Sequence, residues 1–192
     1  MKIILASKSG VRKKILEKNK ISCKVIPSNV DEDEVKTSMI ARNATPELIS
    51  KNLAELKANK ISTKEPDQLV LGADSVIDLE GKLISKPKTR EEAIEILKKL
   101  NGKKHQLISS VCISKNGAMI WHHTDASSLT MKQLNLDEIK SYISKISDNT
   151  LFAYGVYQIE ADGRSLFSNI EGDEDTIMGL PVKKIKEYLN NL

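Results

Sequence analysis

A short apolar run, VLGADSVI at positions 70–77, carries a single carboxylate, Asp74, in its middle. Runs of this length and composition are typical of a strand buried on both faces of a sheet. An unpaired charge in such a strand costs several kcal/mol, so the carboxylate needs a partner. The small residues beside it leave room for a ligand to approach. The run therefore predicts a buried strand that delivers a carboxylate into a cleft; the alternative is an Asp bonded to backbone amides.

Strand and helix patterns interleave along the rest of the chain. Alternating or continuous apolar runs predict strands at 2–6, 21–27, 68–77, 78–85, 105–114, 118–131, 155–160 and 165–170. Helical periodicity and capping residues predict helices at 11–19, 45–61 and 90–100, a further one after Asn135, and one that starts at Pro181. The acidic stretch DEDE at 31–34 reads as a loop.

These elements favour an α/β domain with a mixed sheet. Hairpin signals such as Asn116-Gly117 call for antiparallel strand pairs among the α/β units. A length of 192 residues, without a repeat or a linker, indicates one domain over residues 1–192.

The charge of the chain and its pattern of apolar residues limit the kinds of molecule that it is expected to bind. The 30 Lys and Arg residues nearly balance the 26 Asp and Glu residues, and the net charge of +4 permits anionic partners without requiring them. The basic residues are scattered and lack interleaved aromatic residues, so no stable nucleic-acid binding is expected. No apolar segment is long enough to span a membrane. Cys23 and Cys112 lie in expected strands as small buried side chains, which fits a reducing cytoplasm.

The turn after the first strand could bind phosphate. Ser7 and Ser9 precede the helix at 11–19, whose free N-terminal amides attract anions, and Arg12 adds a fork of donors. The alternative is an ordinary helix cap.

Two further patterns bear on phosphate chemistry. Glu32 in the acidic stretch and Asp74 could share a hard cation such as Mg²⁺ with phosphate oxygens, although a solvated acidic loop explains the stretch equally well. Lys86 is held between an expected strand and Pro87, where a solvated surface lysine is the alternative.

Taken together, these segments resemble a known family. The ordered stretches are LASKSGVRKKIL, LAELKA, VLGADSVIDLEGKLISKP, EEAIEILKKLNGKKHQLIS and IEGDEDTIMGLP. They resemble the successive signatures of the Maf proteins, nucleoside triphosphate pyrophosphatases first described as septum-formation inhibitors. The resemblance implies an elongated, Maf/ITPase-like α/β fold with a central mixed sheet flanked by helices and two lobes around a cleft. It also implies a nucleoside triphosphate substrate, a divalent cation (Mg²⁺ or Mn²⁺) and a homodimer.

The resemblance also implies roles for individual residues. Asp74 matches the proton acceptor of the family's G-A-D strand, and Glu32 matches an acid that helps Asp74 to bind the metal. Arg12, Lys57 and Lys86 match cationic residues of the opening motif, the L-A-x-x-K-A helix and the K-P turn. With these cations around the leaving pyrophosphate and Asp74 orienting a water molecule, no covalent nucleophile is required.

Departures from the family pattern bear on the choice of nucleotide. Val11, Ser75 and Glu160 stand where members resembling dTTP/UTP pyrophosphatases have Arg, Thr and Gln. The stretch with Glu160 is more similar to the branch that includes 7-methyl-GTP pyrophosphatases, and a Glu could accept hydrogen bonds from guanine. We therefore expect a house-cleaning pyrophosphatase, with 7-methyl-GTP as the favoured substrate. A dTTP/UTP-type enzyme and a non-catalytic nucleotide- or nucleic-acid-binding regulator of division are the alternatives.

Overall fold

A computed structural model describes residues 2–192, whose strands form one seven-stranded sheet. The strands are β1 (Lys2–Leu5), β2 (Ser22–Val25), β3 (Val70–Leu79), β4 (Lys82–Ile84), β5 (Lys104–Lys115), β6 (Ala118–Met131) and β7 (Phe167–Glu171). The α-helices are α1 (Gly10–Lys18), α2 (Glu32–Ala41), α3 (Pro46–Ser62), α4 (Arg90–Leu100), α5 (Leu136–Ser144), α6 (Asp148–Tyr154), α7 (Glu174–Ile177) and α8 (Val182–Asn190), and a 3₁₀ helix, η1, covers Asp162–Leu166. None of the helices described in 2–192 is long and apolar enough to cross a membrane.

The sheet is mixed, as the sequence predicts. Its order is β2-β1-β3-β5-β6-β7, with β4 paired to β3. β1 runs parallel to β2 and β3, and the remaining pairs are antiparallel. The predicted turn at Asn116-Gly117 joins β5 to β6, and both residues have the positive φ that a two-residue hairpin turn requires (51° and 82°).

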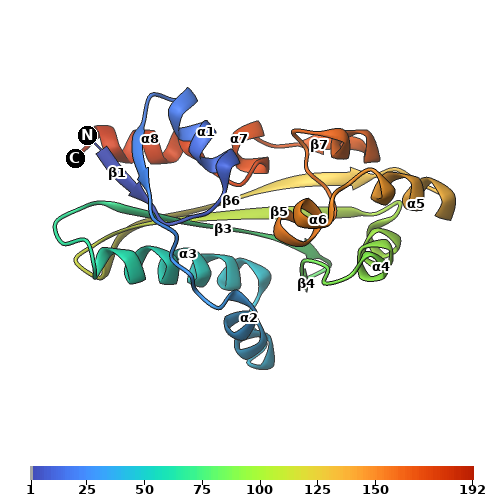
Figure 1. The fold of residues 1–192 in the computed structure, drawn as a ribbon, viewed down its shortest axis with the longest axis horizontal. Helices are drawn as coiled ribbons and strands as arrows, with labels where there is room; N and C mark the ends of the chain where they lie inside the picture. The colour runs from blue at the N-terminus through green and yellow to red at the C-terminus, as the bar shows by residue number, and fades with distance from the viewer. Residues whose placement is uncertain (1) are drawn as a thin grey trace.

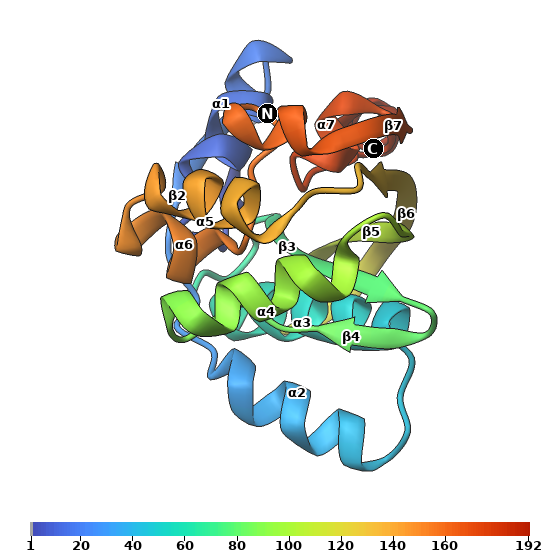
Figure 2. The same cartoon turned by 90° about the vertical axis from the view of Figure 1, so that its right-hand side faces the viewer.

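Helices cover both faces of this sheet and build two lobes along its length. α3 lies on one face against β3 and β5, while α1 and α8 lie on the other (Figure 1). One apolar core joins β1, α1 and α8 to the sheet, and a second gathers α4, α5 and α6 at the end of the sheet that faces the viewer in Figure 2. The long strands β3 and β5 contribute to both cores, so the predicted elongated α/β fold is confirmed.

The small residues of β3 allow a close approach of α3. A Cβ atom on Gly72 would lie 2.1 Å from the carbonyl oxygen of Ala54 and 2.8 Å from the amide nitrogen of Ala58. Both alanines are fully buried. Gly72 therefore sets the distance between strand and helix, and with it the positions of the charged side chains that each carries.

The expected loop at 31–34 is wrong beyond its first residue. Asp31 caps a helix that begins at Glu32, because its side chain accepts a hydrogen bond from the amide of Glu34. Acidic side chains in a first helical turn are stabilised by the helix dipole, so the cluster of negative charge favours a helix at this position.

The expected strand at 155–160 is also wrong. This segment has no strand pairing: Gly155 has a φ of 101°, and the Gln158 side chain donates to the Gly155 carbonyl. Its apolar residues are buried in the protein although they pair with no strand. Their burial explains why the segment has the apolar pattern of a strand. The strand expected at 165–170 begins at Phe167, because η1 occupies the residues before it.

The two cysteines are free, but only one is fully buried. Cys112 lies in the central strand β5 and is buried, whereas Cys23 is half-buried. The difference follows from position, because β2 is an edge strand of the sheet.

Substituting Gly72→Ala should destabilise the protein by about 3 kcal/mol, because the new methyl group meets backbone atoms that cannot move independently. For a chain of this size that corresponds to a fall in Tm of roughly 6–12 °C, measured by calorimetry. Gly10→Ala is the control, since a Cβ there meets nothing within 4 Å. Equal Tm values for the two variants would contradict the close approach of β3 and α3.

Candidate active site

A cleft of about 400 Å³ lies between the two lobes, and every site residue predicted from the sequence lines it. Residues from β1–α1, α2, α3, β3 and the segment after α6 form its walls. The ten sequence-derived residues that line it are Ser7, Ser9, Val11, Arg12, Glu32, Lys57, Asp74, Ser75, Lys86 and Glu160.

Asp74 is buried at the floor of the cleft with one oxygen unpartnered. The residue is 4% exposed, and its Oδ1 accepts a hydrogen bond from the Lys57 ammonium group at 2.8 Å. Its Oδ2 is buried and has no partner within residues 2–192. A buried carboxylate oxygen is costly unless something bonds to it, so Oδ2 could accept a hydrogen bond or hold a cation.

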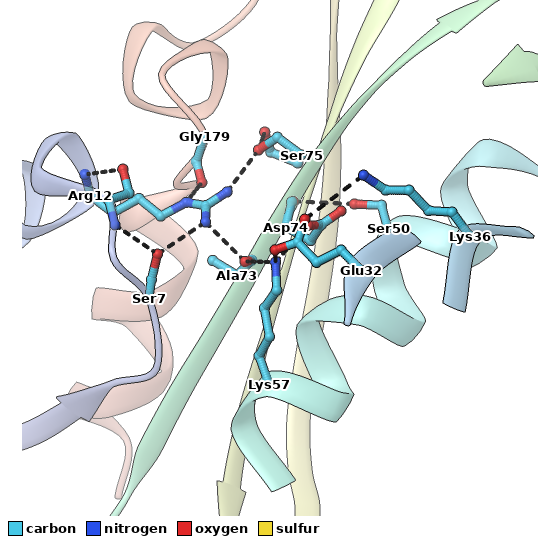
Figure 3. A network of polar contacts seen from close by, with 12 residues as sticks. Ser7, Arg12, Glu32, Lys36, Ser50, Lys57, Ala73, Asp74, Ser75 and Gly179 are labelled. Atoms are coloured by element: carbon cyan, nitrogen blue, oxygen red, sulfur yellow. Dashed lines mark hydrogen bonds and ion pairs between the residues drawn. The ribbon is translucent and has the colours of Figure 1, made fainter. Parts of the chain in front are cut away.

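Lys57 joins two carboxylates from distant parts of the chain. Its ammonium nitrogen lies 2.7 Å from Glu32 Oε1, 2.8 Å from Asp74 Oδ1 and 3.5 Å from the carbonyl oxygen of Ala73 (Figure 3). An ammonium group has three donors, so these contacts use all of them. Lys57 therefore holds the acidic residues in place and has no donor left for a ligand.

Glu32 stays ionised between positive charges. Burial by itself raises the pKa of Glu32, but the ammonium groups of Lys57, Lys86 and Lys36 outweigh that effect and lower the pKa to about 2. The carboxylate can therefore serve as a fixed negative ligand in neutral solution.

Arg12 binds protein groups from three segments. Its Nε donates to the carbonyl oxygen of Gly179 at 3.0 Å, and its Nη1 donates to that of Ala73 at 2.9 Å and to Ser7 Oγ at 3.3 Å. Nη2 donates to Ser75 Oγ at 3.2 Å. Burial lowers the pKa of Arg12 below its ordinary value, although Asp74 and Glu32 oppose that shift. The guanidinium thus fixes the geometry of the cleft, and four of its five N–H groups are committed.

The direction of the hydrogen bonds at Ser75 follows from its neighbours. Ser109 Oγ donates to the carbonyl oxygen of Thr176 at 2.9 Å, so the 2.9 Å contact between the two serine hydroxyl groups has Ser75 as its donor. Ser75 in turn accepts from Arg12. Its single proton is used within the protein, and only its oxygen can interact with a ligand.

The remaining sequence-derived residues lie around the rim. Ser9 caps α1 by accepting from the Arg12 amide at 3.3 Å, so the capping alternative and a place in the cleft both hold. Val11 is half-buried, whereas Lys86 and Glu160 are exposed. Although the Lys86 side chain opens to solvent, the protein around its ammonium group excludes part of its water and lowers its pKa.

Two parts of the cleft are not predicted from the sequence. Lys36 of α2 lines it, and its spacing of four from Glu32 would have indicated a shared helix face had the helix been recognised. Tyr154, at the end of α6, is 51% exposed and also lines it. The far wall is apolar and comes from several elements: Ile77, Ile84, Ile96, Leu107, Val156 and Ile159.

The cleft therefore has a cationic end with two carboxylates and an apolar end. Glu32 and Asp74 are the residues that could hold a hard cation, and within residues 2–192 no cluster of three or more His, Cys, Asp or Glu side chains is assembled for a metal. Two carboxylates suit Mg²⁺, which keeps several water ligands and shares phosphate oxygens instead of needing a complete protein cage. The unpartnered Oδ2 of Asp74 fits that requirement.

Comparison with known proteins gives a family match over residues 2–192, to the family described as Maf-like protein. A nucleoside triphosphate pyrophosphatase of Pelagibacter ubique is 71% identical, covering 97% of this chain and 96% of that protein. A 7-methyl-GTP pyrophosphatase of Brucella abortus is 37% identical, covering 95% and 92%. Among solved structures, a HAM1 protein from Coxiella burnetii has a similar fold, with a TM-score of 0.53, 13% identity and full coverage of both chains.

Glu32→Gln should lower the free energy of unfolding near neutral pH, and the difference from the wild type should disappear in acid. The carboxylate has a pKa near 4.5 when unfolded and about 2 when folded, so its stabilisation is present above pH 4.5 and is lost as the pH falls toward 2. Calorimetry of both proteins across this range measures the effect. Glu34→Gln, an exposed position in the same helical turn without an ion pair in residues 2–192, should change the pH profile much less, because only the helix dipole acts on its carboxylate. If the free energies of unfolding of the wild type and Glu32→Gln differed by the same amount at every pH, the ion pairs assigned to Glu32 would be contradicted.

Proposed function

The chain belongs to the Maf family, and on that premise we propose that it hydrolyses the α–β phosphoanhydride bond of a nucleoside triphosphate to pyrophosphate and a nucleoside monophosphate. The proposal rests mainly on Asp74. Its carboxylate is buried, has one oxygen without a partner in residues 2–192, and lies beside several ammonium groups in a cleft large enough for a ligand. The names of relatives at 71% and 37% identity support the reaction class.

The cleft matches the two halves of such a substrate. The triphosphate carries dense negative charge and suits the end with the ammonium groups, whereas the base and sugar suit the apolar end. Glu32 and Asp74 would hold a divalent cation, Mg²⁺ or Mn²⁺, together with phosphate oxygens. When bound, that cation neutralises phosphate charge and polarises the phosphoryl group.

We assign to Asp74 the role of proton acceptor. In the proposed reaction a water molecule attacks the α-phosphorus, and its proton passes to the Asp74 carboxylate. The bond from phosphorus to the bridging oxygen then breaks, and pyrophosphate leaves with the electron pair. Lys57 keeps the Asp74 carboxylate in place through Oδ1, and Lys86 at the rim stabilises negative charge on the leaving group.

For the base, we propose 7-methylguanine, with a dTTP/UTP-type substrate as the alternative. Glu160 at the rim can accept hydrogen bonds from the N–H groups of guanine. Methylation gives that base a positive charge, which both a carboxylate and the exposed ring of Tyr154 attract. A 37% identical relative named 7-methyl-GTP pyrophosphatase is consistent with this choice. A cytoplasmic location, a homodimer and the lack of stable nucleic-acid binding stay predictions.

The direct test is a panel of 7-methyl-GTP, GTP, dTTP and UTP with Mg²⁺ or Mn²⁺, and with EDTA in the metal-free arm. We expect one pyrophosphate per nucleotide, no orthophosphate, the highest kcat/KM for 7-methyl-GTP and no turnover in EDTA. A preference for dTTP or UTP would overturn the base assignment alone. Tight nucleotide binding without pyrophosphate release with any metal would overturn the enzymatic function and favour the non-catalytic regulator.

Asp74→Asn should lower kcat by about a hundredfold or more, because the amide cannot accept the proton from water. Asp74→Glu keeps the charge but moves the carboxylate by one methylene group, and it should also lose most activity. Asp78→Asn is the control on the same strand, since its side chain bonds to the turn amide of Gly81 outside the cleft. Circular dichroism confirms that each variant is folded. Wild-type turnover in folded Asp74→Asn would exclude Asp74 as the proton acceptor.

A further inference from the structure

Helix α2 buries a lysine and leaves apolar side chains in solvent. Lys36 is 7% exposed and is the one residue of this helix that is fully buried, whereas Ile40 on the same helix is 49% exposed. Helices normally pack through an apolar stripe, and lysine is among the residue types least often buried without a partner. The burial of Lys36 therefore needs a reason other than packing.

The protein compensates the charge of Lys36 only weakly. Within residues 2–192, its ammonium group has one charged partner, Glu32 Oε2, at 3.8 Å. The other oxygen of that carboxylate is already held by Lys57 at 2.7 Å. The contact at 3.8 Å is beyond hydrogen-bond distance, so the donors of Lys36 are free for an anion.

Lys36 points into the same cluster as the proposed reaction centre. Figure 3 shows its side chain extending from α2 toward Glu32, with Asp74 and Lys57 beside it. Five cationic side chains line the cleft (Lys8, Arg12, Lys36, Lys57 and Lys86), against three carboxylates, Glu32, Asp74 and Glu160. The donors of Lys57 and most of those of Arg12 are used by protein groups. The positive charge that can act on a ligand therefore lies on Lys8, Lys36 and Lys86, and Lys36 is the buried one of these three.

We propose that Lys36 is a binding residue for the polyphosphate of the substrate, and that α2 places it there. The proposal rests on the proposed function, since the ligand is the triphosphate of that reaction. A phosphate oxygen accepts a hydrogen bond from the Lys36 ammonium group and adds negative charge to that of the single carboxylate at 3.8 Å. The competing explanation is that the pair with Glu32, one helical turn away, only stabilises α2.

The test compares Lys36→Met, which keeps the length of the side chain and removes its charge, with Lys36→Arg, which keeps the charge. For Lys36→Met we expect KM for the triphosphate to rise about tenfold with kcat changed less than twofold, as for a lost charge-assisted hydrogen bond. The Kd of inorganic tripolyphosphate, measured by calorimetry in EDTA without turnover, should rise by a similar factor. Lys36→Arg should restore most of both values.

Lys88→Met is the matched control. Lys88 also forms an ion pair of 3.8 Å with α2, to Asp33, but it lies outside the cleft. The Lys88→Met substitution should leave the KM for the triphosphate and the Kd of tripolyphosphate unchanged. A lower Tm for Lys36→Met with unchanged KM and Kd would overturn the proposal and leave a purely structural lysine. If no triphosphate releases pyrophosphate, the proposed function fails, but the tripolyphosphate measurement still decides the role of Lys36.

Discussion

The bridge that Lys57 forms between Asp74 and Glu32 is the interaction on which the rest of the site depends. A buried carboxylate and a buried ammonium group each cost several kcal/mol when alone, and they become tolerable only when their hydrogen-bonding groups are matched. Lys57 has three donors and three acceptors around it, from β3 and α2, which leaves one oxygen of Asp74 as the unmatched group. That imbalance turns a structural ion pair into a site that can bind a ligand. It also explains why the strand can carry a charge in the middle of an apolar run.

The close packing of β3 on α3 makes the bridge geometrically possible. Gly72 lets the helix backbone approach the strand, so Lys57 reaches Asp74 with its ammonium group. On the opposite side, Arg12 ties α1 to β3 and to the segment before α8. The long strands then extend into the second lobe, whose apolar residues complete the cleft. The walls therefore differ in chemistry because they belong to different lobes: the first presents most of the charged side chains, and the second presents mainly a hydrocarbon surface with Lys86 and Glu160 at its rim.

Much of this arrangement could be predicted from local pattern. The strand around Asp74, the helix at 90–100 and the turn at Asn116-Gly117 each rest on interactions within a few residues. The two wrong predictions have different physical origins. The stretch at 31–34 looked like a loop because its charges suggested solvent, yet the same charges stabilise the first turn of α2. The segment at 155–160 alternates like a strand, but its apolar residues face a core and a cleft that no local pattern reveals.

The sequence by itself determined which chemical groups are present and where most of the strands and helices form, because those depend on residue type and on neighbours a few positions away. Only the tertiary structure decided which of these groups are free to act. Arg12, Lys57 and Lys86 look alike as cationic residues in the sequence, but the first two commit their donors to carbonyl, hydroxyl and carboxylate groups of the protein. Lys36 follows the acidic stretch without a sequence signal of its own, and its place beside Glu32 depends on the way that α2 buries it. Charge is a property of the residue, whereas availability depends on the partners that folding brings within reach.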